Sequence, residues 1–386
     1  MTSPTSPNPW GVPPWEIDFH PPRQPVPTQV DFAVIGGGFT GLAAAAWLRL
    51  LAPGKSVALI EAGRIGAGAS GRTGGMTLAE SAAGDLPGLG DVLAGLTNIL
   101  EKLGEASGQR LAEVCELQLN GAWEIGRSSG RADSPIQWKD SGELRVVNDV
   151  PGGTLHPAKL VAGLAAAAVH LGVMVIEDAP VSRVVWDRGA KLELSGTSTS
   201  SQKISAARVL FATNALSLGL AGLDSNTNPR LTLAAATAPL REDQIEAIGL
   251  GERKPFYTVD FPYLWGRMFR DNTIVWGAGL VSPSASKDLT QIDISQNEPA
   301  KMFVTLEKRV RGLHPALAQV QFTNKWGGPI LFRDDWRPVF SRHPQSRDGI
   351  VLGAYAGHGV ALSSYLGAWV AEALLGRREL PEWGSI

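Results

Sequence analysis

Three glycines and one acid form the pattern in this chain that points most directly to chemistry. Gly36, Gly38 and Gly41 follow the apolar run 30–35, and Glu61 closes the next apolar run. In a nucleotide-binding turn the first glycine permits a tight bend, the second lets the backbone approach a pyrophosphate, and the third lets a helix pack closely on a strand. An acid in the position of Glu61 accepts a hydrogen bond from a ribose hydroxyl. The pattern therefore predicts a dinucleotide site, with the phosphates at a helix N-terminus.

The elements that must position these residues are a strand over 30–35, a helix that begins near Phe39 and a second strand over 56–60. Together they are expected to form one right-handed crossover unit. The next segment, 63–75, is too rich in glycine for a helix and too apolar for a linker. We therefore expect its backbone to lie against something flat or long.

Two stretches interrupt the nucleotide-binding pattern, and we expect them to pack together as a second domain. The other elements predicted from periodicity are helical spacing over 86–125, a strand pair over 137–147, a helix over 157–171, strands over 173–177 and 207–212, and a strand followed by a helix in 349–371. The predicted fold class is α/β, with a discontinuous Rossmann-like domain and a second, α+β domain on an antiparallel or mixed sheet. The expected boundaries are an extended proline-rich arm over 1–29, the nucleotide-binding domain over 30–85, 152–229 and 326–386, and the substrate domain over 86–151 and 230–325.

Composition narrows the range of partners and compartments. The 386 residues carry a net charge of -2, and only 19% are charged, so no basic field is expected to hold nucleic acid. Cys115 is the only cysteine, which excludes an internal disulfide and a cluster of thiolate ligands, and the histidines and acids show no metal-ligand spacing. The uncharged stretch 349–371 is interrupted by glycines, His358 and serines, so we reject a membrane span and expect a cytoplasmic protein.

Four segments, in this order, resemble the flavin-dependent D-amino-acid oxidase superfamily, which includes sarcosine and glycine oxidases and gamma-glutamylputrescine oxidoreductases. They are 34–41, the sequence Gly-Ala-Ser-Gly-Arg at 68–72, the strand end 210–215, and 353–363. The resemblance implies that FAD, rather than a nicotinamide nucleotide, occupies the predicted site. It also implies where the cofactor binds, at residues Gly36, Gly38, Phe39, Thr40, Gly41, Glu61, Ala62, Arg64, Ala69, Ser70, Gly71, Arg72, Thr73, Gly74, Gly75, Val181, Arg183, Ala212, Thr213, Asn214, Gly357, His358, Gly359, Val360 and Ala361.

Some relatives attach the flavin through a late cysteine or through a histidine in the early glycine segment. Neither residue is present in this chain, so the resemblance predicts non-covalent FAD. The glycine loop 357–359 is expected to open a helix whose positive end faces the flavin and stabilises the anionic reduced ring.

The resemblance further implies the reaction: oxidation of a C–N bond in an amine or amino acid to an imine, by hydride transfer to flavin, with reoxidation by oxygen or another acceptor. Several relatives bind a substrate carboxylate with Arg or Lys after the Gly-His-Gly loop, where this chain has Val360 and Ala361. This difference favours an amine, or an acid anchored elsewhere. Arg72 and Arg267 are the candidate replacements, with a structural role as the alternative for each.

Two further residues complete the candidate catalytic set. His358 lies in the flavin loop, where a supporting role is favoured over proton transfer. Tyr263 belongs to an aromatic group with Tyr257, Trp265 and Trp276, which is interpreted either as a wall for an alkyl amine or cation or, for at least two members, as plain core.

Two other function classes remain open from sequence. An NAD(P)-dependent reductase would account for the first glycine loop, but the segments 66–75 and 353–363 would then have no function. A non-catalytic flavin-binding sensor or partner protein would account for the proline-rich residues 1–27, because such arms dock in partner grooves.

Overall fold

A computed structural model describes residues 8–127, 131–195, 202–283 and 286–385. The chain divides into two compact units, each assembled from three separate stretches. Unit 1 comprises Met1–Glu16, Gln118–Thr154 and Arg230–Pro329, and unit 2 comprises Ile17–Leu117, Leu155–Pro229 and Ile330–Ile386. The predicted fold class is confirmed, since one unit is built on a largely parallel sheet with helices and the other on a mostly antiparallel sheet with helices.

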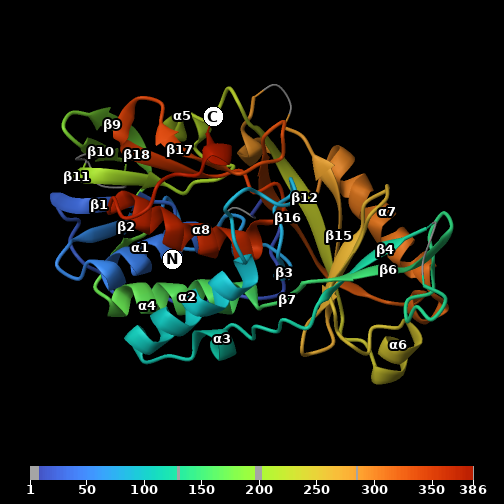
Figure 1. The fold of residues 1–386 in the computed structure, drawn as a ribbon. Helices are drawn as coiled ribbons and strands as arrows, with labels where there is room; N and C mark the ends of the chain where they lie inside the picture. The colour runs from blue at the N-terminus through green and yellow to red at the C-terminus, as the bar shows by residue number, and fades with distance from the viewer. Residues whose placement is uncertain (1–7, 128–130, 196–201, 284–285, 386) are drawn as a thin grey trace. The chain divides into compact units, whose positions relative to one another are not determined.

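Unit 2 contains the predicted strand–helix–strand crossover at the centre of a largely parallel sheet of order β17-β18-β11-β1-β2-β8 (Figure 1). β1 pairs in parallel with both β2 and β11, whereas β17 runs antiparallel to β18, and the additional strands β9 and β10 are antiparallel to each other and β10 to β11. The unit contains β1 (Gln29–Ile35), α1 (Phe39–Leu51), β2 (Val57–Ile60), β3 (Met76–Leu78), α2 (Val92–Ser107), α3 (Leu111–Val114), α4 (Pro157–His170), β8 (Met174–Ile176), β9 (Val181–Trp186), β10 (Ala190–Leu194), β11 (Gln202–Phe211), α5 (Leu218–Ala221), β17 (Val339–His343), β18 (Ser346–Gly353), α8 (Gly359–Leu374) and η3 (Glu382–Gly384).

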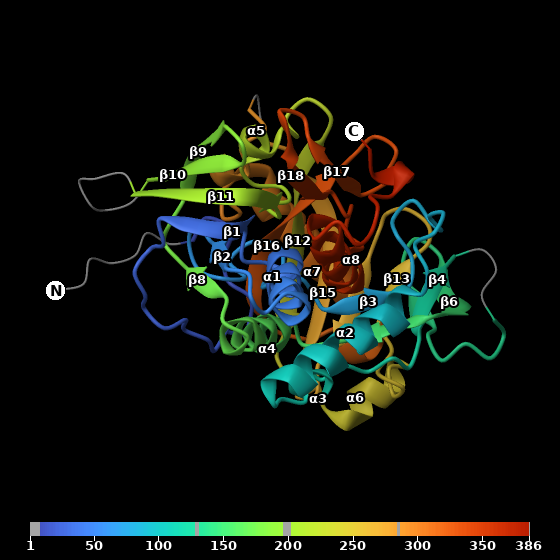
Figure 2. The ribbon, with the colours of Figure 1, turned by 60° about the vertical axis from the view of Figure 1, so that its left-hand side comes forward.

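The two sides of the sheet in unit 2 carry different elements. Figure 2 shows α1 between α4 and α8 on one side of β1 and β2, while β9 and β10 extend from β11 on the other. β11 joins both groups of strands along one edge: its first half pairs antiparallel with β10, and its last residues pair parallel with β18. The parallel strands are apolar along nearly their whole length, as expected for strands buried on both faces.

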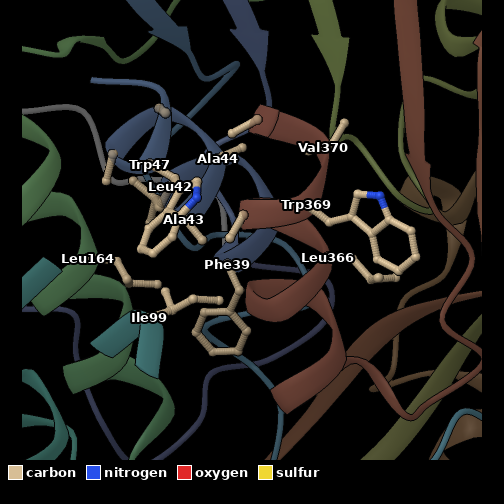
Figure 3. Close-up of a cluster of buried hydrophobic side chains, with 14 of the residues drawn as sticks. Phe39, Leu42, Ala43, Ala44, Trp47, Ile99, Leu164, Leu366, Trp369 and Val370 are labelled. Carbon is tan, nitrogen blue, oxygen red and sulfur yellow. The ribbon is translucent and has the colours of Figure 1, made fainter. Parts of the chain in front are cut away.

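Small side chains let α1 and α8 pack very closely. Residues 43–46 are four consecutive buried alanines, and a Cβ added at Gly367 of α8 would lie only 2.8 Å from the carbonyl oxygen of Thr40. Larger side chains fill the rest of this core: Figure 3 shows Phe39, Leu42 and Trp47 of α1 among Ile99, Leu164 and Leu366. The close approach brings the N-termini of α1 and α8, which both follow glycine loops, into one region of unit 2.

The helical spacing over 86–125 gives a shorter helix than expected, and its place in the fold differs from the predicted domain boundary. The N-cap of α2 is Asp91, whose side chain accepts a hydrogen bond from the Ala94 amide, and its C-cap is Gly108 in the left-handed conformation. Its apolar face packs against α4 and α8 in unit 2, so the stretch 86–117 lies there rather than in the other unit. The breaks at 154/155 and 329/330 fall within four residues of the expected positions, and the break at 229/230 coincides with the expected one. A further break at 16/17 divides the expected arm between the two units.

Unit 1 is built on a mixed sheet of order β16-β12-β15-β14-β13-β4-β6-β5, in which only β13 and β4 are parallel among the named pairs. The strand pair expected over 137–147 is confirmed as β5 and β6. The elements are β4 (Ala122–Gly126), β5 (Trp138–Lys139), β6 (Glu143–Val150), β7 (Gly152–Thr154), β12 (Asn228–Thr237), α6 (Glu242–Ala247), β13 (Phe256–Thr258), β14 (Trp265–Met268), β15 (Ile274–Val281), η1 (Leu289–Gln291), α7 (Asn297–Leu313), η2 (Pro315–Leu317) and β16 (Phe322–Phe332), whose last residues belong to unit 2.

The N-terminal arm is extended, as expected, over its described residues, but it is packed rather than free. Trp10 is buried in unit 1 and donates a hydrogen bond from its indole Nε1 to the carbonyl oxygen of Leu289. The ring of Trp15 lies 5.0 Å from that of Phe269. Residues 1–7 of the expected arm lie outside the described part of the chain.

Among the described residues, no helix is both long and apolar enough to cross a membrane.

Candidate cofactor site

The turn between β1 and α1 adopts a conformation that depends on glycine. Gly36 has φ of +110°, and a Cβ there would lie 2.5 Å from the carbonyl oxygen of Ala212. A Cβ at Gly41 would overlap the carbonyl oxygen of Gly36. These are the close approaches of turn to strand and of helix to turn that the glycine spacing predicts.

The N-terminus of α1 is open to an anion. Its N-cap, Gly38, has no side chain, and the first turn contains no acidic residue. The Phe39 amide donates to the hydroxyl of Ser70, at 2.9 Å, so the second glycine segment lies directly against this helix end. The positive end of a helix suits a pyrophosphate.

Glu61 lies beside the same turn, and its carboxylate is oriented by backbone amides. Oε2 accepts from Gly37 N at 2.7 Å, and Oε1 accepts from Gly63 N at 2.9 Å. Burial raises the pKa of the Glu61 carboxyl group above its usual value, although these two hydrogen bonds oppose the rise. Each oxygen keeps a second lone pair, which is what a ribose hydroxyl would use.

The glycine segment 63–75 is folded into successive turns that are anchored on the first loop. Gly66 N donates to Gly37 O at 2.9 Å, and Gly71 N donates to Gly66 O at 2.9 Å. The Arg72 side chain curls back so that Nε donates to Ala67 O at 3.1 Å. The whole segment is thereby held against the dinucleotide turn.

Glu177 is an organiser of this segment that sequence analysis missed. Its side chain is buried, accepts a hydrogen bond from Ile65 N at 2.8 Å and pairs with the Arg64 guanidinium at 2.9 Å. Arg64, expected beside the cofactor, is thus held by protein groups. The apolar strand that precedes Glu177 resembles its neighbours, and no sequence signal separates this acid from a surface one.

The third and fourth predicted segments meet at Asn214. Its Oδ1 accepts a hydrogen bond from Ala354 N at 3.0 Å. Asn214, Ala354 and Ala356 have positive φ values of 46°, 57° and 49°, which non-glycine residues rarely adopt. Such strained backbone persists where surrounding structure enforces it and is concentrated at binding sites.

The segment around α8 joins the first loop through a buried hydrogen bond. The hydroxyl oxygens of Thr40 and Tyr355 lie 2.7 Å apart. All four predicted segments are therefore connected by hydrogen bonds within unit 2: 36–41 to 61–71, 36–41 to 355, and 214 to 354. Tyr355 is a second residue that motif analysis missed, since a tyrosine before a glycine loop is otherwise unremarkable.

Besides Oγ of Ser363 within α8, two buried polar atoms in these segments have no hydrogen-bond partner among the described residues. They are Oγ1 of Thr213 and Nδ1 of His358. Burial lowers the pKa of the His358 imidazole, which keeps it neutral at neutral pH. Buried polar atoms are nearly always satisfied, so both are suited to a bound polar ligand. The two-phosphate cradle, the ribose acceptor and these atoms together fit FAD.

The predicted catalytic residues fall in different units. Arg72 and His358 belong to unit 2, whereas Arg267 and Tyr263 belong to unit 1. Arg72 is buried, and this burial lowers the pKa of its guanidinium. Arg267 is 3% exposed on β14 and lies over the Phe269 ring at 3.6 Å, whereas Tyr263 is half-exposed in the loop before β14.

The aromatic group divides between core and surface. Trp276 is fully buried, with its ring 5.5 Å from Trp138 and 5.2 Å from Phe256, so it is core. Tyr257 pairs with Trp265 across β13 and β14, and its hydroxyl donates to Glu124 Oε1 at 2.9 Å. Val181 and Arg183, expected near adenine, lie on β9, just after Ala179, whose amide donates to Glu61 O.

The fold and these segments define a two-unit flavoprotein with a Rossmann-like cofactor unit. The family profile described as "FAD dependent oxidoreductase" (DAO) matches residues 31–373, and the chain belongs to this family. It is accordingly an FAD-dependent oxidoreductase, and the resemblance noted from sequence is confirmed, while the nicotinamide and non-catalytic alternatives are not favoured.

Similar proteins agree with this assignment. The chain is 27% identical to the "Probable oxidoreductase OrdL" of Haemophilus influenzae, over 94% of this chain and 86% of that protein. It is 27% identical to the gamma-glutamylputrescine oxidoreductase of Escherichia coli, over 90% and 84% of the two chains. Among solved structures, glycine oxidase from Geobacillus kaustophilus has the same fold, with a TM-score of 0.69, 20% identity, and coverage of 92% and 96%.

Proposed function

We propose that this protein oxidises a C–N bond of an amine or amino acid to an imine, with FAD held non-covalently in unit 2. The main support for this proposal is that hydrogen bonds connect the four predicted flavin-binding segments, which are separate in sequence. They surround the N-termini of two helices, each of which follows a glycine loop. FAD supplies the hydride acceptor when bound.

The residues of this chain have separable tasks in the proposal. The N-terminus of α1 binds the pyrophosphate, and Glu61 accepts from the ribose. The N-terminus of α8, which follows Gly357, stabilises negative charge that develops on the ring. His358 is neutral and half-buried, with its Nδ1 enclosed, so it supports the loop and offers Nδ1 as a hydrogen-bonding group without adding a charge.

The substrate class follows from what is missing after the Gly-His-Gly loop. Val360 and Ala361 are buried and apolar, so this loop provides no cation for an α-carboxylate. We therefore propose an amine, or an amino acid whose acid group is bound elsewhere. The name of the E. coli relative, gamma-glutamylputrescine oxidoreductase, is consistent with such a substrate class.

Arg72 and Arg267 are the proposed alternatives for an acid anchor. Nε of Arg72 donates a hydrogen bond to Ala67 O, and the Arg267 guanidinium stacks on Phe269, so each arginine also has a structural contact. Replacing Arg267 by Lys keeps the charge but removes the planar fork that binds a carboxylate in two places. As a control, Arg270→Lys changes an exposed arginine of the same hairpin.

The decisive experiment is anaerobic reduction of the purified yellow protein. A panel of primary and secondary amines, γ-glutamyl amines and D-amino acids is added under argon, and flavin absorbance is followed. Bleaching by one class supports the proposal and assigns the substrate, and readmission of air then tests whether oxygen is the acceptor. Yellow protein that no amine or amino acid bleaches would refute the proposed reaction, and colourless protein that cannot be reconstituted would refute the cofactor site.

If an acid substrate is identified, the arginine variants separate the two anchors. We expect Arg267→Lys to raise KM at least tenfold with a smaller change in kcat if Arg267 binds the carboxylate, while Arg270→Lys leaves both unchanged. An unchanged KM in Arg267→Lys assigns the anchoring role to another residue.

A further inference from the structure

Ile17 of the N-terminal arm packs on the second glycine segment. Cδ1 of Ile17 lies so near that a Cβ added at Gly66 would be 2.5 Å from it, and a Cβ added at Gly71 would be 2.9 Å from it. One methyl group therefore covers both glycines. Gly66 and Gly71 are themselves joined by a backbone hydrogen bond, so Ile17 packs on the turn that this bond closes.

Arm residues on both sides of this contact are arranged to hold it. From Gly11 to His20 exposure alternates, with Trp15, Ile17 and Phe19 half-buried and Glu16, Asp18 and His20 exposed. Ile17 and Phe19 both pack on the hydrophobic core of unit 2. The arm is thus a single extended strand-like segment with one apolar edge.

A polar contact is made from the opposite, exposed edge of the arm. His20 Nδ1 accepts a hydrogen bond from Arg64 Nη2 at 2.8 Å, and Arg64 also pairs with Glu177. Glu177 in turn holds Ile65 N. The arm therefore reaches both ends of the turn 65–71, through Ile17 and through His20.

The turn transmits this contact to the nucleotide loop. Gly66 donates to Gly37 O, and Ser70 accepts from the amide of Phe39 at the N-terminus of α1. We propose that the arm, through Ile17, is a positioning element for FAD that fixes the segment 66–71 against the pyrophosphate loop. This inference rests on the proposed location of FAD in unit 2.

The physical consequence is a slower loss of cofactor. If 66–71 must shift for FAD to leave, the packing of Ile17 adds to the free energy of that opening. The arm would then belong to the cofactor site, whereas proline-rich composition alone suggests a partner-binding tail.

The test uses full-length holoenzyme and a substitution that removes only the contacting atom. Ile17→Val deletes Cδ1, and Ile17→Ala deletes both γ carbons as well. Asp18→Ala, an exposed neighbour on the same arm, is the matched control. The readouts are the FAD dissociation rate, followed by fluorescence of released FAD, the dissociation constant for FAD added to apoprotein, and the melting temperature of apoprotein.

We expect Ile17→Val to raise the FAD dissociation constant about twofold to tenfold, the range expected for one buried methyl group, and Ile17→Ala to raise it more than about tenfold. Asp18→Ala should behave as wild type. A merely structural contact would lower the apoprotein melting temperature and leave FAD dissociation unchanged, and that result would overturn the inference. So would an equal effect of Asp18→Ala.

Failure of the underlying function gives a different pattern. If wild-type protein takes up no FAD, the cofactor assignment fails and the proposed role of the arm fails with it. If wild-type protein takes up FAD, the location of the cofactor is checked by protection of residues 64–73 from hydrogen exchange on FAD addition. Protection of that segment in wild type, lost in Ile17→Ala, supports the arm, and no protection in wild type overturns it.

Discussion

The hydroxyl groups of Thr40 and Tyr355 lie 2.7 Å apart, and this buried hydrogen bond joins the first turn of α1 to the loop that opens α8. Burial raises the pKa of Tyr355 well above its usual value, so the phenol stays protonated and remains available as a donor. The two helix ends assigned to the two ends of FAD are thereby linked through side chains.

Removing this hydrogen bond should destabilise the protein measurably. We expect Tyr355→Phe and Thr40→Val each to lower the free energy of unfolding by about 1–2 kcal/mol, because each leaves the other hydroxyl buried without its hydrogen-bond partner. Urea denaturation of both single variants and the double variant should give a coupling energy of at least about 0.5 kcal/mol. The control is Tyr365 of α8, whose hydroxyl donates a hydrogen bond to Leu89 O. Tyr365→Phe should show no coupling to Thr40→Val.

Glycine at position 41 should be indispensable, whereas glycine at position 63 should not. A Cβ at Gly41 would overlap Gly36 O, and a Cβ at Gly63 meets nothing within 4 Å. We expect Gly41→Ala to abolish FAD retention or folding, and Gly63→Ala to retain wild-type flavin content. Absorbance of the purified proteins checks both. Normal flavin content in Gly41→Ala would contradict the geometry of the turn.

Cys115 should be unreactive in the folded protein. It is buried, and this burial raises the pKa of its thiol to about 12. The reactive thiolate is therefore scarce at pH 8. We expect negligible labelling by iodoacetamide in buffer and one label per chain in urea, measured by mass spectrometry. Labelling at similar rates in both conditions would contradict the burial of the thiol.

His358 should make apoprotein stability depend on pH in a predictable direction. Because its folded-state pKa lies below the unfolded value of about 6.5, the unfolded state binds the proton more readily, and stability falls as pH drops below that value. We expect His358→Gln to show a smaller loss of unfolding free energy between pH 7 and 5. His343, whose pKa burial also lowers, is the matched control.

The two histidine variants should differ in cofactor binding. His343 lies between the rings of Trp186 and Phe211 and is itself not one of the predicted cofactor residues. His343→Gln should therefore reduce the pH dependence of stability while leaving FAD affinity unchanged, and His358→Gln should weaken FAD binding. Equal FAD affinity in both variants would argue against a place for His358 beside the cofactor.

The nucleotide-binding core was predictable because its signals are local and mutually consistent. An apolar run, three spaced glycines, a helix and an acid all fall within residues 30–61, and each has one physical interpretation. The strand pair over 137–147 was likewise predictable from alternation. Helical periodicity at 92–107 shows that one face is buried, but it does not say against which unit, and for this reason the expected boundary at 86 differed.

The less predictable parts depend on contacts between residues distant in sequence. The period-2 alternation at Trp15, Ile17 and Phe19 was present, but the prolines around it suggested only an extended arm, or one that docks in a partner groove. Glu177 and Tyr355 act through single side chains in ordinary surroundings. Arg267 and Tyr263 were chosen by residue type, and their burial differs sharply once the fold is known.

The interleaved order of the sheet in unit 2 affects how the protein is made. β1 must pair with β11, and β11 with β18, so the central register joins Ile35 to Phe211 and Phe211 to Val351. A nascent chain emerging from the ribosome has nearly all of its residues exposed before these strands can align. Cofactor loading is therefore expected after release of the finished polypeptide, and chaperone demand should be high during synthesis.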